Sequence, residues 1–554
     1  MNRRTFVKTT ATASLAVMTG CSLKNRFNII IVNGMIFDGS GGEAFQSDIG
    51  IINGKIAAID NLKNASADTI IDGTGLAISP GFIDIHTHTD FELLANSNAE
   101  SKVMQGVTTE VSGNCGYSPF PLNESDYQAE DEDTFEKYGF HVDWKDVDGF
   151  LRRLEKQKIS FNYATFTGHG NLRSCVVGKN DVQATPEQLT AMKKLLEQSI
   201  DSGSFGMSTG LEYAPGSYAS TAELIELNNV VAKKNAIYAT HMRDEEDNVV
   251  EAVEEALKIC RETGVSLQIS HLKANQPANW HKMDRILDII HAAADSGLPV
   301  KADRYPYIAY STGLTSFLPL WSRQGNTKDV IARMNDRNLI PDIETYIEKC
   351  GQNMGGWDRV VICSSHTDEN KKWIGKSIAE CIAEKKIPPA KFIRNLLTEE
   401  RNRVSIVGFG MEEGNLKKVL SSPLVMVASD GSAVAPYGTL GKGQPHPRFY
   451  GTFPRVLGKY CREEKLFDLA TAVKKMTSMP ANKLGLTKRG LLKKNYFADI
   501  VVFNPKTVID NATFENPHQF PTGIEHVIVN GKITVQKGKH TGAHAGAVLR
   551  HRLS

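Results

Sequence analysis

Several features that would place a chain in a particular class are missing from this one. No run of about 18 apolar residues occurs, so no transmembrane helix is predicted. The 64 basic and 63 acidic residues nearly cancel to a net charge of +1, so no nucleic-acid partner is expected. The 8 cysteines are scattered, unlike the dense disulfide framework of a small secreted domain. What remains is a chain of 554 residues, 41% of them hydrophobic, which can bury more than one core.

We interpret residues 1–25 as an export signal and tether rather than as part of the fold. Residues 2–8 (NRRTFVK) resemble a twin-arginine signal, and a short apolar stretch follows at residues 11–18. Residues 18–21 (MTGC) then resemble a lipoprotein cleavage box with Met18 in place of the usual leucine. We therefore expect an exported protein, periplasmic or anchored to the membrane by a lipid on Cys21. A signal cleaved without lipidation, or kept as an anchor, is the alternative.

The two ends of the remaining chain are both rich in β-strand signals. Residues 28–32 (NIIIV) lead into Asn33-Gly34, and residues 49–52 (IGII) lead into Asn53-Gly54, which are hairpin signals. Residues 498–503 (ADIVVF) and 526–533 (HVIVNGKI) have the same character near the other end. This predicts one small β-sandwich domain built from both termini, residues 26–78 and 488–554.

Between these ends, apolar strand-like runs alternate with amphipathic helical patterns. The runs lie at residues 81–85, 108–111, 161–167, 203–207, 237–239, 265–269, 299–302, 360–363 and 424–428. Such alternation predicts an α/β fold with a parallel sheet. The number of units and the size, about 250 residues plus insertions, favour a TIM (β/α)8 barrel over residues 79–487, with an insertion at about 312–373. A doubly wound open sheet is the alternative, but no Gly-rich phosphate loop follows the first strand.

A His-x-His pair stands where the first barrel strand is predicted to end. His86 and His88 belong to residues 81–90 (GFIDIHTHTD). Side chains two positions apart on a strand share a face, so the two imidazoles form half of a metal site. Taken alone, the pair is more often two solvated loop histidines, and the case for a metal depends on the rest of the chain.

Further candidate ligands follow later strand-like runs. They are Cys115 in SGNCG, His241 in ATHMRDE, His271 in SHLK and Asp430 in ASDG. Each has a structural alternative, because single cysteines and histidines are often buried in a core and Ser-Asp-Gly is typical of turns. Active residues of TIM barrels stand at the C-terminal ends of strands. Together these positions predict a hydrolase with one or two metals.

At this point the chain resembles the D-aminoacylase (N-acyl-D-amino-acid deacylase) family of the amidohydrolase superfamily. The similar segments are PGFIDIHTHTD, GVTTEVSGNCGYSPFP, STGLEYAPG, ATHMRDE, SHLKA, YPYIAYSTGL, ASDGSA, HPRFYGTFPRVLG and ADIVVFNP. They span nearly all of the mature chain. Many amidohydrolases bridge two metals with a carboxylated lysine, whereas this family has a cysteine there, which Cys115 matches.

The resemblance implies which residues bind metal. One tight Zn²⁺ would be held by Cys115, His241 and His271, since thiolate and imidazole donors favour zinc. A second, weaker position would use His86 and His88 together with Cys115 and Asp430. Asp430 would also be the catalytic residue that moves protons.

The resemblance further implies an N-acyl-D-amino acid as the small-molecule substrate, split into a carboxylate and a free D-amino acid. The substrate carries an α-carboxylate, and Lys273 and Arg448 are the candidate cations for it. Tyr307 and Ser311 match the substrate-binding positions of the family. His169, in TGHGN, is a candidate substrate contact or else a structural loop histidine.

Other functions remain open alternatives. A cyclic-amide hydrolase of the dihydroorotase or hydantoinase kind would share the barrel and the His-x-His pair, but a lysine would stand where Cys115 does. A D-residue dipeptidase would cleave a related amide. A non-catalytic binding lipoprotein with a decayed site would lack ligands that are present here.

Overall fold

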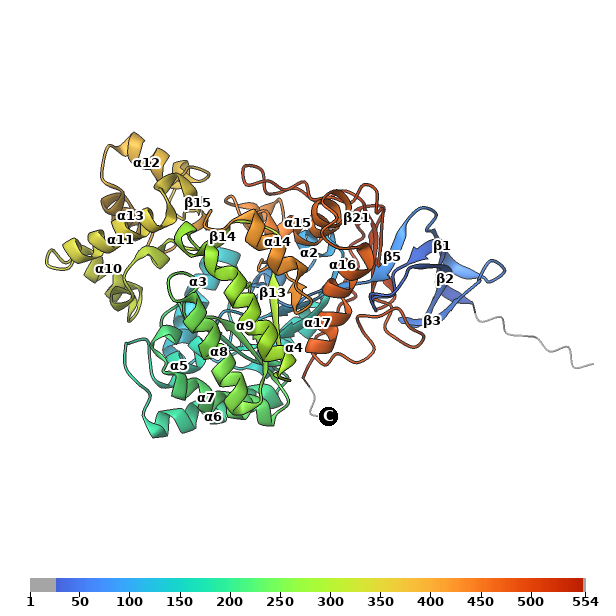
Figure 1. The fold of residues 1–554 in the computed structure, drawn as a ribbon, viewed down its shortest axis with the longest axis horizontal. Coiled ribbons are helices and arrows are strands. Elements are labelled where there is room, and N and C mark those ends of the chain that lie inside the picture. Colours follow the sequence, from blue (N-terminus) through green and yellow to red (C-terminus); the bar gives the residue numbers. More distant parts are fainter. Residues whose placement is uncertain (1–25, 552–554) are drawn as a thin grey trace, which may run out of the picture.

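The computed structural model describes residues 26–551, so the expected export signal and Cys21 lie outside the described residues. The described chain is a mixed α/β structure, elongated in Figure 1, with strands β1 to β3 at one end and helices α10 to α13 at the other. No helix among residues 26–551 is both long enough and apolar enough to span a membrane.

The central part of the chain contains two parallel sheets. One has three strands in the order β6-β7-β8, and the other has six in the order β17-β13-β12-β11-β10-β9. The prediction of parallel strands that alternate with helices is therefore confirmed. The strands are β6 (Phe82–Asp84), β7 (Val107–Ser112), β8 (Asn162–Thr165), β9 (Thr167–Gly168), β10 (Gly206–Gly210), β11 (Ile237–His241), β12 (Ser266–Ile269), β13 (Val300–Arg304) and β17 (Val425–Val427).

Hydrogen bonds connect the two parallel sheets on both sides. Only Phe166 separates β8 from β9, and the N–H of Phe205, directly before β10, donates to the Thr165 carbonyl of β8 at 2.8 Å. On the other side, Thr87 after β6 forms a parallel bridge with Gly431 after β17. The Asp430 N–H also donates to the His86 carbonyl at 2.9 Å. The strands nevertheless form two hydrogen-bonded ladders rather than one closed sheet.

Helices pack on the outside of the six-stranded sheet because each presents an apolar face to it. Leu196 of α6, Leu224 of α7, Leu257 of α8 and Ile286 of α9 belong to one buried core with the strands. The N-terminus of α6 is a capping box, in which Thr185 and Gln188 each accept the other's main-chain N–H. The helices around the two parallel sheets are α1 (Glu92–Ala95), α2 (Glu100–Val103), α3 (Glu124–Tyr138), α4 (Val147–Gln157), α5 (His169–Val176), α6 (Pro186–Asp201), α7 (Thr221–Lys233), α8 (Val249–Thr263), α9 (Met283–Asp295), α14 (Glu413–Ser421), α15 (Arg448–Arg455), α16 (Leu469–Met476) and α17 (Ser478–Lys483).

The two chain ends share one nine-stranded sheet, in the order β21-β20-β19-β18-β5-β1-β2-β3, with β4 paired to β1. Strand β1 changes partner along its length, since residues 27–32 pair with β4 and Met35 and Ile36 pair with β5. An isoleucine-rich core lies within this sheet. The strands that we expected to form a small sandwich are therefore hydrogen-bonded to one another in a single sheet. Its strands are β1 (Phe27–Ile36), β2 (Phe45–Ile52), β3 (Lys55–Asp60), β4 (Ala67–Asp72), β5 (Ala77–Pro80), β18 (Ile500–Phe503), β19 (Ile524–Val529), β20 (Lys532–Gln536) and β21 (Lys539–His540).

The segment between β13 and β17 carries a small sheet and a core of its own. Its antiparallel strands are β14 (Tyr310–Gly313), β16 (Ser405–Gly408) and β15 (Val360–Ser364), in this spatial order. Residues 360–363, which the sequence pattern placed among the parallel strands, therefore belong here. Because β16 pairs with both other strands, the segment extends beyond the expected 312–373. Its helices are α10 (Thr327–Asn335), α11 (Ile340–Met354), α12 (Ile378–Lys385) and α13 (Pro389–Glu399).

Candidate metal centre

The structure brings the predicted metal ligands together at the C-terminal ends of the parallel strands. Their donor atoms form two groups that share Cys115, and the atoms of each group lie within 4.8 Å of one another. One group joins Cys115 to His241, at the end of β11, and to His271, just after β12. The other group consists of Cys115, His86, His88 and Asp430. These are the two sets that the sequence resemblance implied.

The spacing of the donors fits zinc. Cys115 Sγ lies 3.4 Å from His86 Nε2 and 3.5 Å from His271 Nε2. Asp430 Oδ1 lies 3.0 Å from His88 Nε2 and 3.3 Å from His86 Nε2. Zinc bonds of about 2.3 Å to sulfur and about 2.0 Å to nitrogen or oxygen, at a tetrahedral angle, hold two donors about 3.3 to 3.6 Å apart. Both the donor types and their separations therefore suit this ion.

Three residues of the centre have a backbone conformation that side chains seldom adopt. The φ angles of Cys115, His271 and Asp430 are 52°, 34° and 50°, in the left-handed region. Long-range hydrogen bonds hold two of these turns. The His271 N–H donates to Asp303 Oδ1 at 2.7 Å, and the Asp430 N–H donates to the His86 carbonyl at 2.9 Å. Next to Cys115, a Cβ on Gly116 would lie 2.5 Å from the Gly210 nitrogen. Strain of this kind is typical of functional sites, where the surrounding structure maintains it.

Local charges keep the two acidic ligands ionised. Burial opposes the Cys115 thiolate, but the charges of His86 and His271 outweigh it and hold the thiol pKa well below its ordinary value. Burial likewise opposes the Asp430 carboxylate, and here Arg448 and His86 hold the pKa well below its usual range. A metal binds the deprotonated form of both groups, so the thiolate and the carboxylate are already in the form that a metal ion would bind.

Carboxylates lie behind two of the histidine rings. His271 Nδ1 lies 2.9 Å from Glu245 Oε1, and His86 Nδ1 lies 3.2 Å from Asp303 Oδ1. Such pairs direct Nε2 toward the metal and raise the basicity of the ligand. Sequence reasoning missed Glu245 and Asp303. The sequence did offer a signal for each: Glu245 lies four residues after His241, and Asp303 is a charged residue near the end of the apolar run at residues 299–302.

The two candidate cations for the substrate have different surroundings. Arg448 is 3% exposed, and its Nη2 lies 3.0 Å from Asp430 Oδ2. Its Nε and Nη1 are buried without a hydrogen-bond partner among residues 26–551. Lys273 also lies at the centre, 2.9 Å from His271 Nδ1, but it is ion-paired with Glu245. Arg448 therefore keeps donors for a ligand, whereas the charge of Lys273 is already balanced.

Two other predicted substrate residues, Tyr307 and Ser311, have their contacts with residues that are not metal ligands. The buried Tyr307 hydroxyl donates to Asp510 Oδ2 at 3.2 Å, and its ring packs against His446, two residues before Arg448. Ser311 is half-buried on β14, where it pairs with Val407 of β16. Within residues 26–551, no hydrogen bond or ion pair joins Ser311 to the metal ligands.

His169 is buried in the protein interior and is not open to a substrate. Its side chain is fully buried, and its Nε2 lies 2.9 Å from Glu223 Oε1 of α7. Glu223 is also ion-paired with Arg173 of α5. Burial, with smaller effects of the Arg173 and Arg243 charges, lowers the pKa of His169, and the pair with Glu223 opposes this effect. These contacts connect α5 to α7 and favour a structural role for His169.

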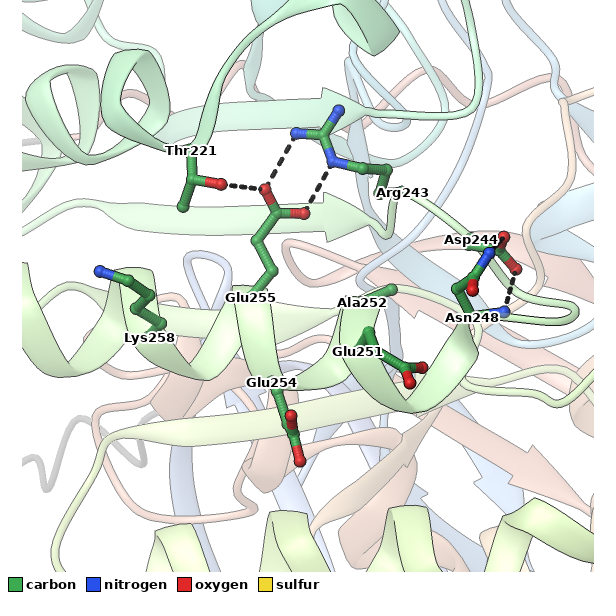
Figure 2. A pocket seen from close by; sticks show the side chains of 9 residues that line it. All are labelled: Thr221, Arg243, Asp244, Asn248, Glu251, Ala252, Glu254, Glu255 and Lys258. Carbon is green, nitrogen blue, oxygen red and sulfur yellow. Dashed lines mark hydrogen bonds and ion pairs between the residues drawn. The ribbon is translucent and has the colours of Figure 1, made fainter.

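A surface pocket lies beside this region but does not contain the metal ligands. Figure 2 shows Arg243 and Glu255 facing one another across it, with Thr221 also bonded to Glu255. The two Arg243–Glu255 hydrogen bonds are each 2.9 Å long. The remaining lining residues are Asp244, Asn248, Glu251, Ala252, Glu254 and Lys258. None of the predicted site residues lines this pocket, so it is separate from the metal centre.

Comparison with known proteins agrees with the geometry. Residues 395–535 match the Amidohydrolase family. A D-aminoacylase of Alcaligenes xylosoxydans xylosoxydans is 37% identical over 523 residues, which are 94% of this chain and 97% of that protein.

Two solved structures are similar along nearly the whole length. The N-acyl-D-glutamate deacylase of Bordetella bronchiseptica, solved with zinc and a phosphonate mimic of the tetrahedral intermediate, has a TM-score of 0.79 and 32% identity. A D-aminoacylase described as having a binuclear metal centre has a TM-score of 0.80 and 34% identity. Each similarity covers 95% of this chain and 100% of the other. The chain therefore has an amidohydrolase fold and belongs to the D-aminoacylase family of the amidohydrolase superfamily.

Proposed function

We propose that this protein is a zinc-dependent hydrolase that cleaves the amide bond of N-acyl-D-amino acids. One observation carries the proposal: the Cys115-centred ligand groups stand at the strand ends of a chain that matches a D-aminoacylase along 97% of that enzyme's length. The products would be a carboxylate and a free D-amino acid.

Cys115, His241 and His271 would hold one zinc ion, and His86 and His88 would contribute to a second position with Cys115 and Asp430. Zinc at such a centre lowers the pKa of bound water to about 7 and polarises a carbonyl group. The thiolate in place of a lysine separates this centre from that expected of a cyclic-amide hydrolase.

Asp430 is placed to move the proton in this reaction. Its Oδ1 faces His88 Nε2 at 3.0 Å and its Oδ2 faces Arg448 Nη2 at 3.0 Å, so the carboxylate is fixed at both oxygens. As water adds to the acyl carbon and the C–N bond breaks, Asp430 accepts a proton from the water and returns it to the amine nitrogen.

Arg448 supports binding of the substrate carboxylate. Its buried Nε and Nη1 have no partner among the described residues, and a guanidinium with unused donors binds a carboxylate strongly. The guanidinium lies over the Tyr305 ring, 4.6 Å from the ring centre, which fixes its plane. Lys273 remains a weaker candidate because Glu245 already neutralises it.

We also infer the finer architecture. The hydrogen bonds on both sides of the two parallel sheets support a single TIM barrel across residues 79–487. The segments 26–78 and 488–554 would form the small second domain, which the shared nine-stranded sheet supports.

The proposed reaction is tested by amine release from paired N-acetyl-D- and N-acetyl-L-amino acids, including the glutamate pair, with zinc-loaded protein. We expect release from D substrates only. Asp430→Asn should lower kcat by about 10²- to 10⁴-fold, the usual contribution of a general acid–base, while the zinc ion held by Cys115, His241 and His271 stays bound. Asp368→Asn is the control, because the Asp368 side chain is 89% exposed. Zinc-loaded protein that releases no amine from either enantiomer would overturn the proposal.

Export is proposed from the sequence signal alone. Residues 2–21 support a twin-arginine route and a lipid on Cys21, which would place the enzyme in the periplasm or on a membrane. Intact cells should then hydrolyse a substrate that cannot cross the inner membrane once it has entered the periplasm. Cys21→Ser should move the protein from the membrane fraction to the soluble one. Activity that appears only after lysis of spheroplasts would contradict export.

A further inference from the structure

A buried lysine contacts the turn that carries Asp430. Lys102 of α2 is fully buried, and its Nζ donates to the Ser429 hydroxyl at 2.6 Å and to Asp84 Oδ2 at 3.0 Å. Glu110 Oε1 also lies 3.0 Å from this Nζ. Asp84 ends β6, Glu110 belongs to β7, and Ser429 follows β17. One ammonium group therefore joins two strands of the three-stranded sheet to the turn that leaves the six-stranded sheet.

Hydrogen bonds on both sides of Asp430 hold this turn. The Ser429 N–H donates to Asp84 Oδ1 at 2.9 Å, so Asp84 contacts both the lysine and the turn. After Asp430, the Gly431 N–H donates back to the Ser429 hydroxyl at 3.1 Å. The φ angle of Asp430 is 50°, a conformation that costs energy in residues other than glycine. The direction of the Asp430 carboxylate therefore depends on the contacts that hold the turn.

Stability by itself does not account for an ionic group buried at this place. Burial opposes the charge of Lys102, but the Asp84 and Glu110 charges outweigh it and raise the lysine pKa, so Lys102 remains a charged donor. Well-packed apolar side chains of similar volume often stabilise a fold as well as a buried ion group does, or better. Apolar side chains could not donate to the buried Ser429 hydroxyl, and this donor is what the lysine supplies.

We propose that Lys102 is a positioning residue for Asp430 and acts through the Ser429 hydroxyl. The lysine fixes Ser429, Ser429 fixes the main chain on both sides of Asp430, and the carboxylate is thereby held toward His88 and Arg448. The inference rests on the proposed function, in which Asp430 moves the proton.

The test removes the hydroxyl and the lysine separately and together. Ser429→Ala deletes the shared acceptor and leaves the contacts of Lys102 with Asp84 and Glu110 in place. Lys102→Met removes the donor, and the double variant shows whether the two residues act as a unit. Where Lys102→Met does not fold, Ser429→Ala decides the question, because it leaves every buried charge paired.

Ser204→Ala is the matched control. Ser204 is as buried as Ser429, and its hydroxyl also accepts from a side chain, that of Thr167, at 2.9 Å. It lies before β10, at the strand ends opposite to the metal centre. For each protein we would measure kcat and KM with an N-acetyl-D-amino acid, the thermal midpoint, and the affinities for a first and a second Zn²⁺ by competition with a chromogenic chelator.

We expect Ser429→Ala to lower kcat by about 10- to 100-fold and to weaken the second Zn²⁺ affinity by a similar factor, since Asp430 belongs to that ligand group. The KM and the first Zn²⁺ affinity should change little. The double variant should lose no more than the more affected single variant. Ser204→Ala should lower the thermal midpoint without changing kcat or either affinity.

Wild-type values of both kcat and the second Zn²⁺ affinity in Ser429→Ala would overturn the inference and leave the proposed function intact. Equal losses in Ser204→Ala would also overturn it, because a general effect on the fold would then explain them. Losses that multiply in the double variant would show that Lys102 does not act through Ser429. Protein that releases no amine, but whose second Zn²⁺ affinity falls in Ser429→Ala, would overturn the proposed function and support the positioning of Asp430. Wild-type protein that neither releases amine nor binds a second Zn²⁺ would overturn both.

Discussion

At the scale of single residues, buried charges in this protein are placed in pairs and triads. Lys102 Nζ lies 3.0 Å from the carboxylates of Asp84 on β6 and Glu110 on β7, and all three side chains are fully buried. Lys102 also donates to Ser429, directly before Asp430. Removing one partner of such a group leaves an uncompensated buried charge, which costs far more than an exposed pair contributes.

The triad of His169, Arg173 and Glu223 gives a test at this scale. Glu223→Gln should destabilise the protein by about 3 to 5 kcal/mol, because Arg173 would remain buried without its counter-charge. The expected readout is a lower thermal midpoint with an unchanged KM. Glu226→Gln is the control, since its ion pair with Lys193 is partly exposed. A higher KM with unchanged stability would instead support His169 as a substrate contact.

At the scale of elements, one arginine connects three parts of the chain next to the metal centre. Arg243 binds Glu255 of α8 through two hydrogen bonds (Figure 2). It also donates to the carbonyls of Ser217 and Ala219. It thereby attaches the loop between β10 and α7 to α8. This loop carries Glu212, so its position affects the carboxylate beside His241.

Arg243→Lys should loosen this loop, because a lysine keeps the charge but cannot reproduce the planar set of donors. Amide hydrogen exchange in residues 211–219 should become faster, and the thermal midpoint should fall by a few degrees. Arg152→Lys on α4 is the control, as the Arg152 side chain is 67% exposed. Exchange in residues 211–219 at the wild-type rate would contradict the role given to Arg243.

A lysine on α16 predicts a pH dependence of stability. Lys475 is 3% exposed and donates to the carbonyls of Ser422 and Val425, at the start of β17. Burial, with smaller effects of Lys301 and Lys474, lowers its pKa from 10.5 to about 8. Between these values the unfolded chain binds more protons than the folded one, so the contribution of this group to stability rises with pH.

This contribution should be constant below about pH 8 and should grow by about 3 kcal/mol as the pH rises through the unfolded pKa. Thermal midpoints of wild-type protein and Lys475→Met, measured from about pH 7 to about pH 10, give the difference. The wild type should gain relative to the variant as the pH increases. Lys506→Met, at an exposed lysine that does not affect the pKa of Lys475, should keep the wild-type slope. A difference that does not vary with pH would refute the prediction.

At the scale of the whole molecule, the C-terminal residues tie the parallel strands together from their N-terminal side. Residues 546–551 run beside the start of β8, where the Tyr163 N–H donates to the Ala547 carbonyl at 2.9 Å. The Leu549 N–H donates back to Tyr163 at 2.7 Å, and the His551 N–H donates to Gly203 before β10 at 2.9 Å. The segment therefore links the three-stranded and six-stranded sheets at the opposite ends from the metal centre.

Gly546→Ala should displace this segment, because a Cβ at Gly546 would lie 1.9 Å from the Phe161 carbonyl oxygen. The thermal midpoint should fall by several degrees, while the Zn²⁺ affinity of the folded protein stays the same. His544→Ala, at an exposed position two residues earlier, should have little effect. An equal midpoint in the two variants would show that the segment contributes nothing to stability.

The sequence by itself determined the family and the types of residue at the centre. His86, His88, Cys115, His241, His271 and Asp430 each follow an apolar run, and a strand delivers the residue after its end to a common edge. The parallel arrangement was readable for the same reason, since apolar runs alternate with helical periodicity. The matching hairpin signals at both termini also indicated that the two ends belong together.

Only the tertiary structure decided which groups contact these ligands. Asp303, Glu245 and Glu212 become neighbours of the histidines through pairings between distant strands, which no local pattern encodes. The same long-range contacts neutralise Lys273, leave donors of Arg448 unpaired, and assign residues 360–364 to the small antiparallel sheet. A side chain's chemistry is local to the sequence, whereas its partner and its burial are set by the packing of the whole fold.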